Sequence, residues 1–160
     1  MPSIVNPMDA FVAFEPALKR GDLKVQPGEV HPDILVHFDS PNGEMRLTYA
    51  KVRGESLVAI AIIVRAEPLN GLPVFQIGYA VPQHLRKRGL AKEIAQAAID
   101  EFTNGIARGG ITSFYIEAVV GVRNVASQKV AGHVIGGQPE EIEDDDSGEP
   151  ALQYTRKIGS

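Results

Sequence analysis

Three basic residues and a glycine stand where an expected strand turns into an expected helix. Arg86, Lys87 and Arg88 precede Gly89, and Lys92 adds a further positive charge. The first N–H groups of a helix have no partner within the helix and lie at the positive end of its dipole, so they favour an anion. Gly89 has no side chain that would hold a phosphate away from the backbone. The pattern predicts a phosphate-binding turn, and the alternative is a basic, solvated start of a helix.

The segments on both sides of this turn have the periodicities that such a site needs. Alternating apolar residues over 75–81 predict a strand, which Pro82 ends because proline has no N–H to donate. Apolar residues at helical spacing over 90–102 predict a helix, with Asn104-Gly105 as its stop signal. We therefore expect residues 86–91 to lie on the first turn of this helix.

The order of Arg86, Gly89 and Ala91 resembles the acetyl-CoA signature of the Gcn5-related N-acetyltransferases. In that family Gln or Arg is followed, after two residues, by Gly and then, after one more, by Gly or Ala. The resemblance implies that backbone amides of this turn hold the pyrophosphate of acetyl-CoA, the acyl donor, and that strand backbone pairs with its pantetheine arm. The cofactor-binding residues that it implies here are Ala80, Val81, Arg86, Lys87, Arg88, Gly89, Leu90 and Ala91.

A second strand-to-helix junction follows the apolar run over 114–120, with Asn124 and Ser127 just after it. It resembles a later motif of the same family, in which an Asn after the fifth strand precedes a small residue on the next helix by three positions. Because residues three apart share one helix face, both side chains are expected in one cleft. The resemblance implies that both contact the cofactor. The alternative for Asn124 is a helix N-cap that touches no ligand.

The proton donor for the departing CoA thiolate is not marked by the family pattern. Many family members carry a Tyr seven positions after the Asn, where it can protonate this thiolate, and the chain has Ala131 there. Ser127, the more distant Tyr154 or water is left to supply the proton. We name Ser127 as the candidate.

Glu117 is the candidate general base for attack by an amine, directly or through water. It is the one acid in an otherwise apolar expected strand, where a carboxylate indicates either a partner or a function. The alternative is a carboxylate at a solvated position or paired with Arg65 or Arg156. Gln76 and Tyr79 are second candidates, for orienting the acceptor, and the alternative for Tyr79 is an aromatic residue of the core.

Length and composition fit one globular domain. The chain has 160 residues, of which 44% are hydrophobic and 22% charged, and it has no cysteine. The lack of cysteine excludes disulfides, thiolate metal ligands and a cysteine nucleophile. The four histidines lack the spacing of a metal site, so no metal is expected. No secretory signal and no apolar run of about 20 residues is found, so we expect a cytoplasmic protein without a membrane partner.

The charge is unevenly distributed along the chain. Seven acidic residues and no Lys or Arg lie between Pro139 and Pro150, which leaves the remainder mildly basic. Turn-forming residues in this segment predict a hairpin loop, over about 139–150, that links the last two strands. It is either a solvated loop or an attractor for a cationic amine acceptor. The basic residues are too few and too local to predict a nucleic-acid partner.

The remaining segments supply a scaffold. A helix over 10–20 is expected, with Asp9 as its cap and Pro16 at a bend or interruption. Strands are expected over 34–38, 45–52 and 56–66, with hairpin turns between them. The order predicts one α/β domain over 1–160 with a cofactor-binding core at about 73–134. Its fold is similar to that of the Gcn5-related N-acetyltransferases, a mixed, mostly antiparallel sheet of six to seven strands flanked by helices.

These patterns predict an N-acetyltransferase that moves an acetyl group from acetyl-CoA to an amine of a small molecule or a protein by direct attack. The alternative is a catalytically degenerate module that binds acyl-CoA and acts as a sensor or interaction domain. A generic nucleotide-binding fold is disfavoured, because neither Gly-x-x-x-x-Gly-Lys-Ser/Thr nor Gly-x-Gly-x-x-Gly occurs. The acceptor, the acyl chain and the oligomeric state stay open, with a homodimer among the alternatives.

Overall fold

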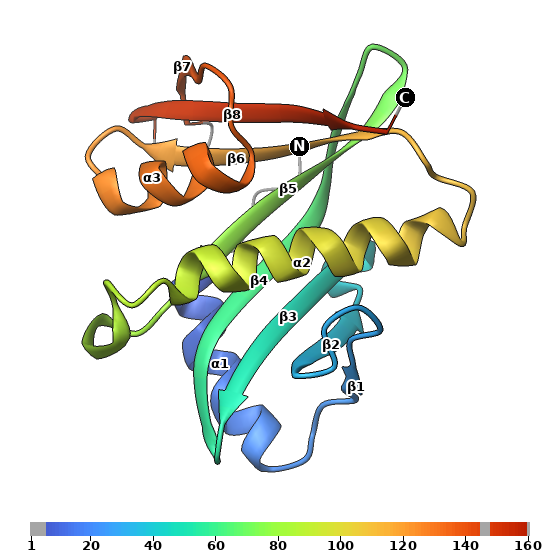
Figure 1. Cartoon of the computed structure of the whole chain (residues 1–160), viewed down its shortest axis with the longest axis vertical. Coiled ribbons are helices and arrows are strands. Elements are labelled where there is room, and N and C mark those ends of the chain that lie inside the picture. The colour runs from blue at the N-terminus through green and yellow to red at the C-terminus, as the bar shows by residue number, and fades with distance from the viewer. Residues whose placement is uncertain (1–5, 145–147, 160) are drawn as a thin grey trace.

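The computed structural model describes residues 6–144 and 148–159, which form a single eight-stranded sheet with three α-helices packed on it. The strand order is β1-β2-β3-β4-β5-β6-β8-β7, and only the β5–β6 pair is parallel. The strands are β1 Gln26–Pro27, β2 Ile34–Asp39, β3 Arg46–Arg53, β4 Ser56–Leu69, β5 Leu72–Ala80, β6 Phe114–Gly121, β7 Glu140–Glu143 and β8 Pro150–Ile158. The helices are α1 Pro7–Lys19, α2 Leu90–Ala107 and α3 Val125–Val134 (Figure 1).

The mixed, mostly antiparallel sheet was predicted, but the structure has more strands than the six to seven expected. Strand β1, with two residues, was not predicted, and β7, with four residues, lies within the segment over about 139–150 that was predicted as a hairpin loop. Neither is long enough to show a clear alternation of apolar residues in the sequence, and each is defined by pairing with a longer neighbour.

The two faces of the sheet are covered by different helices. In Figure 1, α2 and α3 lie across the near face and α1 lies behind the sheet. Strand β4 is continuously apolar over 57–64 because this part of the strand is buried on both faces. Ala61 and Ile63 belong to the core under α2, whereas Ile60 and Ile62 pack with Phe11 and Phe14 of α1. A strand buried on both faces was predicted here from its continuous apolar run.

Three phenylalanines fix α2 on the sheet at the point where β5 and β6 run in parallel. Phe75 of β5 lies with its ring centroid 4.6 Å from that of Phe102 on α2 and 5.7 Å from that of Phe114 on β6. The remaining pair, Phe102 and Phe114, is also 5.7 Å apart, and all three contacts are edge-to-face, the favourable arrangement for aromatic rings. The position of α2 relative to both strands is therefore well defined.

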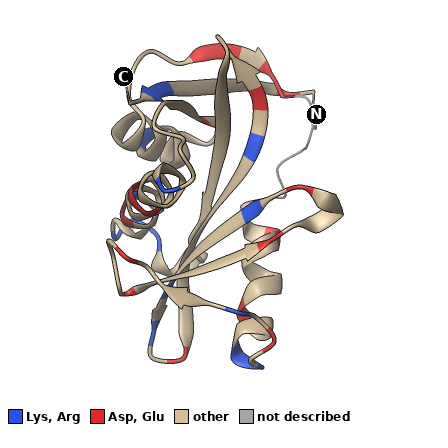
Figure 2. Ribbon diagram, turned by 90° about the vertical axis from the view of Figure 1, so that its right-hand side faces the viewer, with Lys and Arg blue, Asp and Glu red and all other residues tan. Residues whose placement is uncertain are grey.

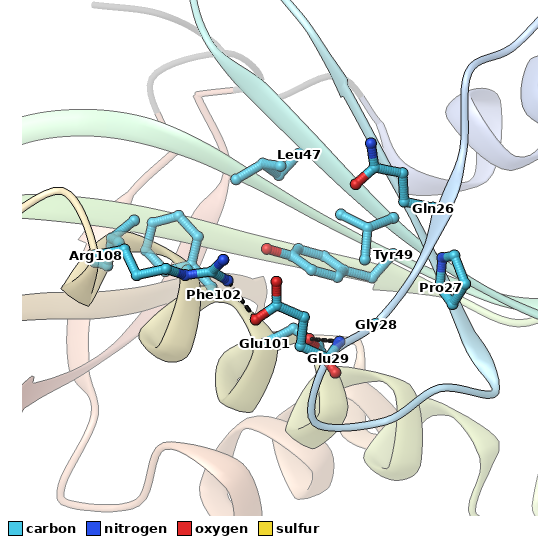
Figure 3. A pocket seen from close by; sticks show the side chains of 12 residues that line it. Gln26, Pro27, Gly28, Glu29, Leu47, Tyr49, Glu101, Phe102 and Arg108 are labelled. Carbon is cyan, nitrogen blue, oxygen red and sulfur yellow. Dashed lines mark hydrogen bonds and ion pairs between the residues drawn. The ribbon is translucent and has the colours of Figure 1, made fainter.

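Glu101 joins α2 to the loop before β2. Its carboxylate is 7% exposed and accepts hydrogen bonds from three consecutive backbone N–H groups, those of Glu29 and Val30 at 2.9 Å and that of His31. A Cβ on Gly28 would lie 2.4 Å from the Glu101 Oε2 atom, so the loop can approach this close only with glycine at that position. The carboxylate borders a cavity of about 310 Å³ that is also lined by the buried Tyr49 (Figure 3).

Two helix boundaries differ from those predicted. Helix α1 begins at Pro7, because Asn6 Oδ1 accepts hydrogen bonds from the N–H groups of Met8 at 2.9 Å and Asp9 at 3.4 Å. The predicted cap, Asp9, is therefore wrong, and Asp9 lies in the first turn. The helix continues through Pro16. Asn6 and Asp9 are both residue types that cap helices well, so the sequence pattern alone did not show which of the two is the cap.

Helix α2 continues past the predicted stop at Asn104-Gly105 and ends at Ala107. Ile106 in this last turn packs against the core, and its carbonyl accepts from the N–H groups of Gly109 and Ile111. Tertiary packing has therefore overridden the local signal of a single interior glycine. The Gly109-Gly110 pair, with Gly110 at a φ of 90°, makes the turn toward β6.

The acidic segment belongs to a hairpin of the last two strands, but residues 140–143, which were predicted as part of its loop, form a strand. Strand β7, three of whose four residues are glutamates, pairs in antiparallel register with β8, from Glu140 opposite Gln153 to Glu143 opposite Pro150 (Figure 2). Residues 145–147 of the predicted loop lie outside the described residues. No helix among the described residues combines the length and the apolar character that crossing a membrane requires.

Candidate functional site

The sheet opens between β5 and β6. The two strands pair in parallel over three residues only, from Val74 opposite Tyr115 to Gln76 opposite Glu117. Beyond this point residues 77–80 pair only with β4, and residues 118–121 pair only with β8. The inner edges of the two strands therefore have backbone N–H and C=O groups without a strand partner, which are available to an extended ligand.

A cavity of about 860 Å³ occupies this opening. It is lined by both strand ends, by the turn before α2, and by the first turns of α2 and α3. The cavity also reaches both faces of the sheet. Tyr79 lines it on the face that packs against α2, whereas Gly78 faces the opposite side, where residues 6–8 close the cavity. Two ligands approaching from opposite faces of the sheet can therefore meet in it.

The cavity lining is cationic. It includes Arg86, Lys87, Lys92 and Lys129, and among the residues that the structure describes it includes no Asp or Glu. Positive side chains around a partly enclosed space raise the local concentration of an anion. The charge pattern therefore suits a ligand that carries phosphate groups.

The turn before α2 has the conformation of an anion-binding helix start, although one detail of the prediction is wrong. Residues 86–88 precede the helix and do not belong to its first turn, because α2 begins at Leu90 with Gly89 as its N-cap. Gly89 has a φ of 79° and makes no side-chain cap, so the N–H groups of the first turn face the cavity. Lys87 also has a positive φ, 66°, which a non-glycine residue rarely adopts.

The arginines of this turn differ in position. Arg86 lines the cavity, and its Nε donates a hydrogen bond to the Val81 carbonyl at 3.1 Å, which ties the turn to the end of β5. Arg88 is exposed and does not line the cavity. The other predicted cofactor residues of this region all line it, namely Ala80, Val81, Lys87, Gly89, Leu90 and Ala91.

Asn124 and Ser127 lie together at the start of α3, as predicted. Asn124 is the N-cap, and its Oδ1 accepts from the Ser127 N–H at 3.1 Å, so the capping alternative is observed. Both residues also line the cavity, which leaves the Asn124 amide nitrogen and the Ser127 hydroxyl as groups that a ligand can reach. Their contact with a cofactor stays a prediction.

The Tyr79 side chain reaches from β5 to α3. Its hydroxyl donates a hydrogen bond to the Ser127 carbonyl at 2.7 Å. Burial raises the pKa of Tyr79, the nearby Tyr154 adds to the rise, and hydrogen bonds from the Ala131 backbone and the Ser127 side chain oppose it. Tyr79 is therefore neutral at physiological pH. Tyr154 itself is buried in the core and is not part of the cavity lining.

Glu117 stands at the point where the strands separate. It is 7% exposed, and its Oε2 accepts a hydrogen bond from Gln153 Nε2 at 2.7 Å, so its observed partner is an amide and not Arg65 or Arg156. Burial raises the pKa of Glu117, and the hydrogen bond from Gln153 opposes this rise. Glu117 is not part of the cavity lining, and it faces the side of the sheet away from α2.

Some residues of the site had no signal in the sequence. Lys129 lines the cavity from α3, and residues 6–8 line it from the start of α1, far from both predicted motifs. Gln153 on β8 supplies the partner of Glu117. Among the described residues, no group of three or more His, Asp or Glu side chains is placed to hold a metal ion.

Known structures resemble this one. RimJ from Mycobacterium smegmatis, in complex with a CoA disulfide, has a TM-score of 0.57 and 20% sequence identity, over 73% of this chain and 55% of that chain. RimL, a ribosomal alpha-N-protein acetyltransferase in complex with coenzyme A, has a TM-score of 0.53 and 23% identity, over 74% of this chain and 64% of that chain. An acetyltransferase from Salmonella typhimurium that modifies the N-terminal serine of a 50S ribosomal subunit protein has a TM-score of 0.52 and 18% identity, over 74% of this chain and 66% of that chain.

These likenesses confirm the predicted fold, that of the Gcn5-related N-acetyltransferases. This chain spans less than two thirds of the length of each of the three structures. No protein-family model matches the chain, and no curated protein matches its sequence.

Proposed function

We propose that this chain is an N-acetyltransferase, folded as one domain over residues 1–160, that transfers the acetyl group of acetyl-CoA to an amine. The observation that carries this proposal is the cationic cavity that passes through the sheet between β5 and β6. It offers a phosphate site at one end and two unpaired strand edges in the middle. CoA has the matching features in the same order, a pyrophosphate and then an amide-containing pantetheine arm.

The cofactor is proposed to enter from the side of α2 and α3. Backbone N–H groups at the start of α2, with Arg86 and Lys87, hold the pyrophosphate. The pantetheine amides pair with the free edge of β5 near Ala80 and Val81, because β6 has separated from β5 there and offers no backbone partner. Asn124 and Ser127 border the same path. This arrangement directs the thioester toward the point where the strands separate.

The acceptor amine is proposed to enter from the other face, where Glu117 lies. A buried carboxyl whose pKa is raised is closer to the acidity that a general base needs near neutral pH than an ordinary glutamate is. It accepts a proton from the amine, directly or through water. The neutral nitrogen attacks the thioester carbonyl carbon, the C–N bond forms, and the C–S bond breaks with its electron pair going to sulfur.

An α-amine of a peptide or protein is the proposed class of acceptor. The similar structures of the RimL type are described as acting on ribosomal protein N-termini, which supports this choice over a small-molecule amine. The acidic hairpin that carries Glu140, Glu141 and Glu143 is proposed to attract a cationic acceptor.

Two measurements test the proposal. Calorimetric titration with CoA should show binding that weakens as ionic strength rises, because the phosphate site is charged. Incubation with acetyl-CoA and a panel of amines, including peptides with free N-termini and polyamines, should release free CoA thiol for at least one amine. CoA binding without turnover on any amine would support the alternative, an acyl-CoA-binding sensor or interaction module. No CoA binding at all would refute both.

A further inference from the structure

The thiolate that leaves in the proposed reaction needs a proton, and the cavity contains few groups that can give one. Among its described lining residues, only Tyr79 and Ser127 carry a hydroxyl, and the lysines and the arginine are the other donors. We propose that Tyr79 is the catalytic residue that protonates the thiolate. This inference rests on the proposed function and assigns a role that Ser127 was expected to fill.

The position of Tyr79 on β5 supports this role. Residues 77–80 form the free strand edge along which the pantetheine arm is proposed to lie, so a side chain from this edge stands beside the end of that arm. Its hydroxyl reaches α3 and is held by the Ser127 carbonyl at 2.7 Å. Ala131, fully buried on the same helix, has a side chain small enough to leave room for the phenol. The hydroxyl is therefore fixed in the cavity wall between the two structural elements that enclose the ligand.

Tyr79 is better placed than the other donors. The Ser127 side chain hydrogen-bonds to Tyr79, which makes it a group that positions the phenol. Tyr154 is buried in the core outside the cavity lining. Lys129 lines the cavity with an exposed side chain, as is suited to a phosphate or to solvent. A half-buried phenol whose hydroxyl donates to the Ser127 carbonyl combines access with a fixed position.

The proton balance of the step is complete. As the C–S bond breaks, the electron pair of that bond moves to sulfur, and the Tyr79 O–H proton moves to the same atom to give the thiol of CoA. The tyrosinate then takes a proton from water. Glu117 accepts the first proton of the amine before the attack, and the nitrogen loses its second proton to water after the C–N bond has formed, so the protons balance and no oxidant or reductant is needed.

Kinetics of the Tyr79→Phe variant test the inference, with Tyr115→Phe as the matched control. Tyr115 lies on β6 outside the cavity lining, so it is not on the proposed path of the ligand. Its hydroxyl accepts a hydrogen bond from the Asn70 amide at 3.1 Å. We expect kcat of Tyr79→Phe to fall by about 10²-fold or more while the dissociation constant for CoA changes less than about threefold, because the proton is transferred only in the transition state. Tyr115→Phe should keep both values. A kcat of Tyr79→Phe within about fivefold of the wild type would overturn the inference.

A second measurement needs no turnover. A phenol that donates a hydrogen bond to the thiolate stabilises the charged form, so it lowers the pKa of the thiol of bound CoA. The pH dependence of alkylation of protein-bound CoA should therefore shift to higher pH in Tyr79→Phe than in the wild type and in Tyr115→Phe. The charged groups that face the cavity, Arg86, Lys87, Lys92 and Lys129, are the same in all three proteins.

The outcomes separate this inference from the proposed function. A wild type that binds CoA and acetylates an amine, with neither kcat nor the alkylation profile altered in Tyr79→Phe, would refute the role of Tyr79 and keep the proposed function. CoA binding without turnover, together with a shifted alkylation profile, would refute acetyl transfer and support the contact of Tyr79 with the sulfur. A wild type that binds no CoA would overturn both.

Discussion

Gln76 of β5 and Glu117 of β6 stand opposite one another in the last pair before the two strands separate. Their side chains share the face of the sheet away from α2, where Glu117 is 7% exposed and accepts a hydrogen bond from Gln153. The separation of the strands therefore begins beside a buried carboxylate. Glu117 therefore lies where a ligand held between β5 and β6 would meet a second ligand that approaches from the face of the sheet away from α2.

Replacing Glu117 by glutamine should lower turnover and change the pH dependence of stability. Burial raises the pKa of Glu117 in the folded state above its unfolded value, so the wild type is most stable where this carboxyl is protonated in both states. Its contribution is lost as pH rises through the folded pKa. Glutamine keeps the size and does not titrate, so the free energy of unfolding of Glu117→Gln, relative to the wild type, should increase from pH 4 to pH 8.

The check is urea denaturation of both proteins at several pH values, beside initial rates with one amine. We expect kcat to fall by roughly 10²-fold, as is typical for loss of a general base. A full rate combined with the expected stability profile would show that Glu117 is a buried acid without a catalytic role. A relative stability that decreases with pH would contradict the raised pKa.

Replacing Gly89 by valine should weaken CoA binding in a protein that still folds. A Cβ at this position meets nothing within 4 Å, so the substituted side chain would extend into the space from which a phosphate approaches. The positive φ of 79° makes any side chain strained there, at a cost of about 1–2 kcal/mol. Calorimetric titration should show CoA affinity reduced by about tenfold or more, equivalent to ~1.4 kcal/mol.

Gly21→Val is the matched control for backbone strain. Gly21 has a φ of 75°, also meets nothing within 4 Å, and follows the end of α1 away from the cavity lining. Both variants should lose similar stability in urea, and only Gly89→Val should lose CoA affinity. Equal CoA affinity in the two folded variants would remove the phosphate site from the start of α2.

The sequence was informative wherever the signal is local. The alternation over 75–81, the basic turn at 86–89 and the helical spacing after it lie within one short segment, and the structure places them as a strand, a turn and a helix in that order. The same is true of the cap at Asn124, whose hydrogen bond spans three residues. Local propensity and capping chemistry are fixed by neighbours along the chain.

The contacts that complete the site join distant segments, and no local pattern predicts them. Tyr79 meets Ser127 across 48 residues, and Glu117 meets Gln153 across 36. Strand order brings these partners together, since β8 pairs with β6 and α3 covers the end of β5. The extension of α2 beyond Gly105 has the same cause, because the packing of Ile106 is decided by the tertiary structure.

Glu101 should be among the most important residues for stability, although it is charged. Its carboxylate accepts from the N–H groups of Glu29, Val30 and His31, and truncation would leave these backbone donors unsatisfied beside the core. Hydrogen bonds to a charged group contribute about 1.5–3 kcal/mol each when measured singly and do not add fully, so Glu101→Ala should cost about 3 kcal/mol.

Asp100→Ala is its neighbouring control on the same helix. Asp100 shares a hydrogen bond of 2.9 Å with the His31 ring at a half-exposed position, where such a bond contributes about 0.5–1.5 kcal/mol. The stability of both variants is measured by urea denaturation, and their affinity for CoA is measured as well. A loss for Glu101→Ala no larger than that for Asp100→Ala would show that the loop over 28–31 is not anchored by this carboxylate.

Serine in place of Asn124 separates the two roles that this residue is given. The observed hydrogen bond from the Ser127 N–H to Asn124 Oδ1 is a helix cap, and serine caps a helix about as well as asparagine does, whereas alanine costs about 1 kcal/mol. Asn124→Ala should therefore lose stability and Asn124→Ser should not. If the amide nitrogen also contacts CoA, as proposed, both variants should bind CoA more weakly, because neither retains that donor. Thermal denaturation and calorimetric titration of the pair decide the matter. Wild-type CoA affinity in a fully stable Asn124→Ser would leave Asn124 as a cap alone, and it would confine the proposed cofactor contacts of α3 to Ser127.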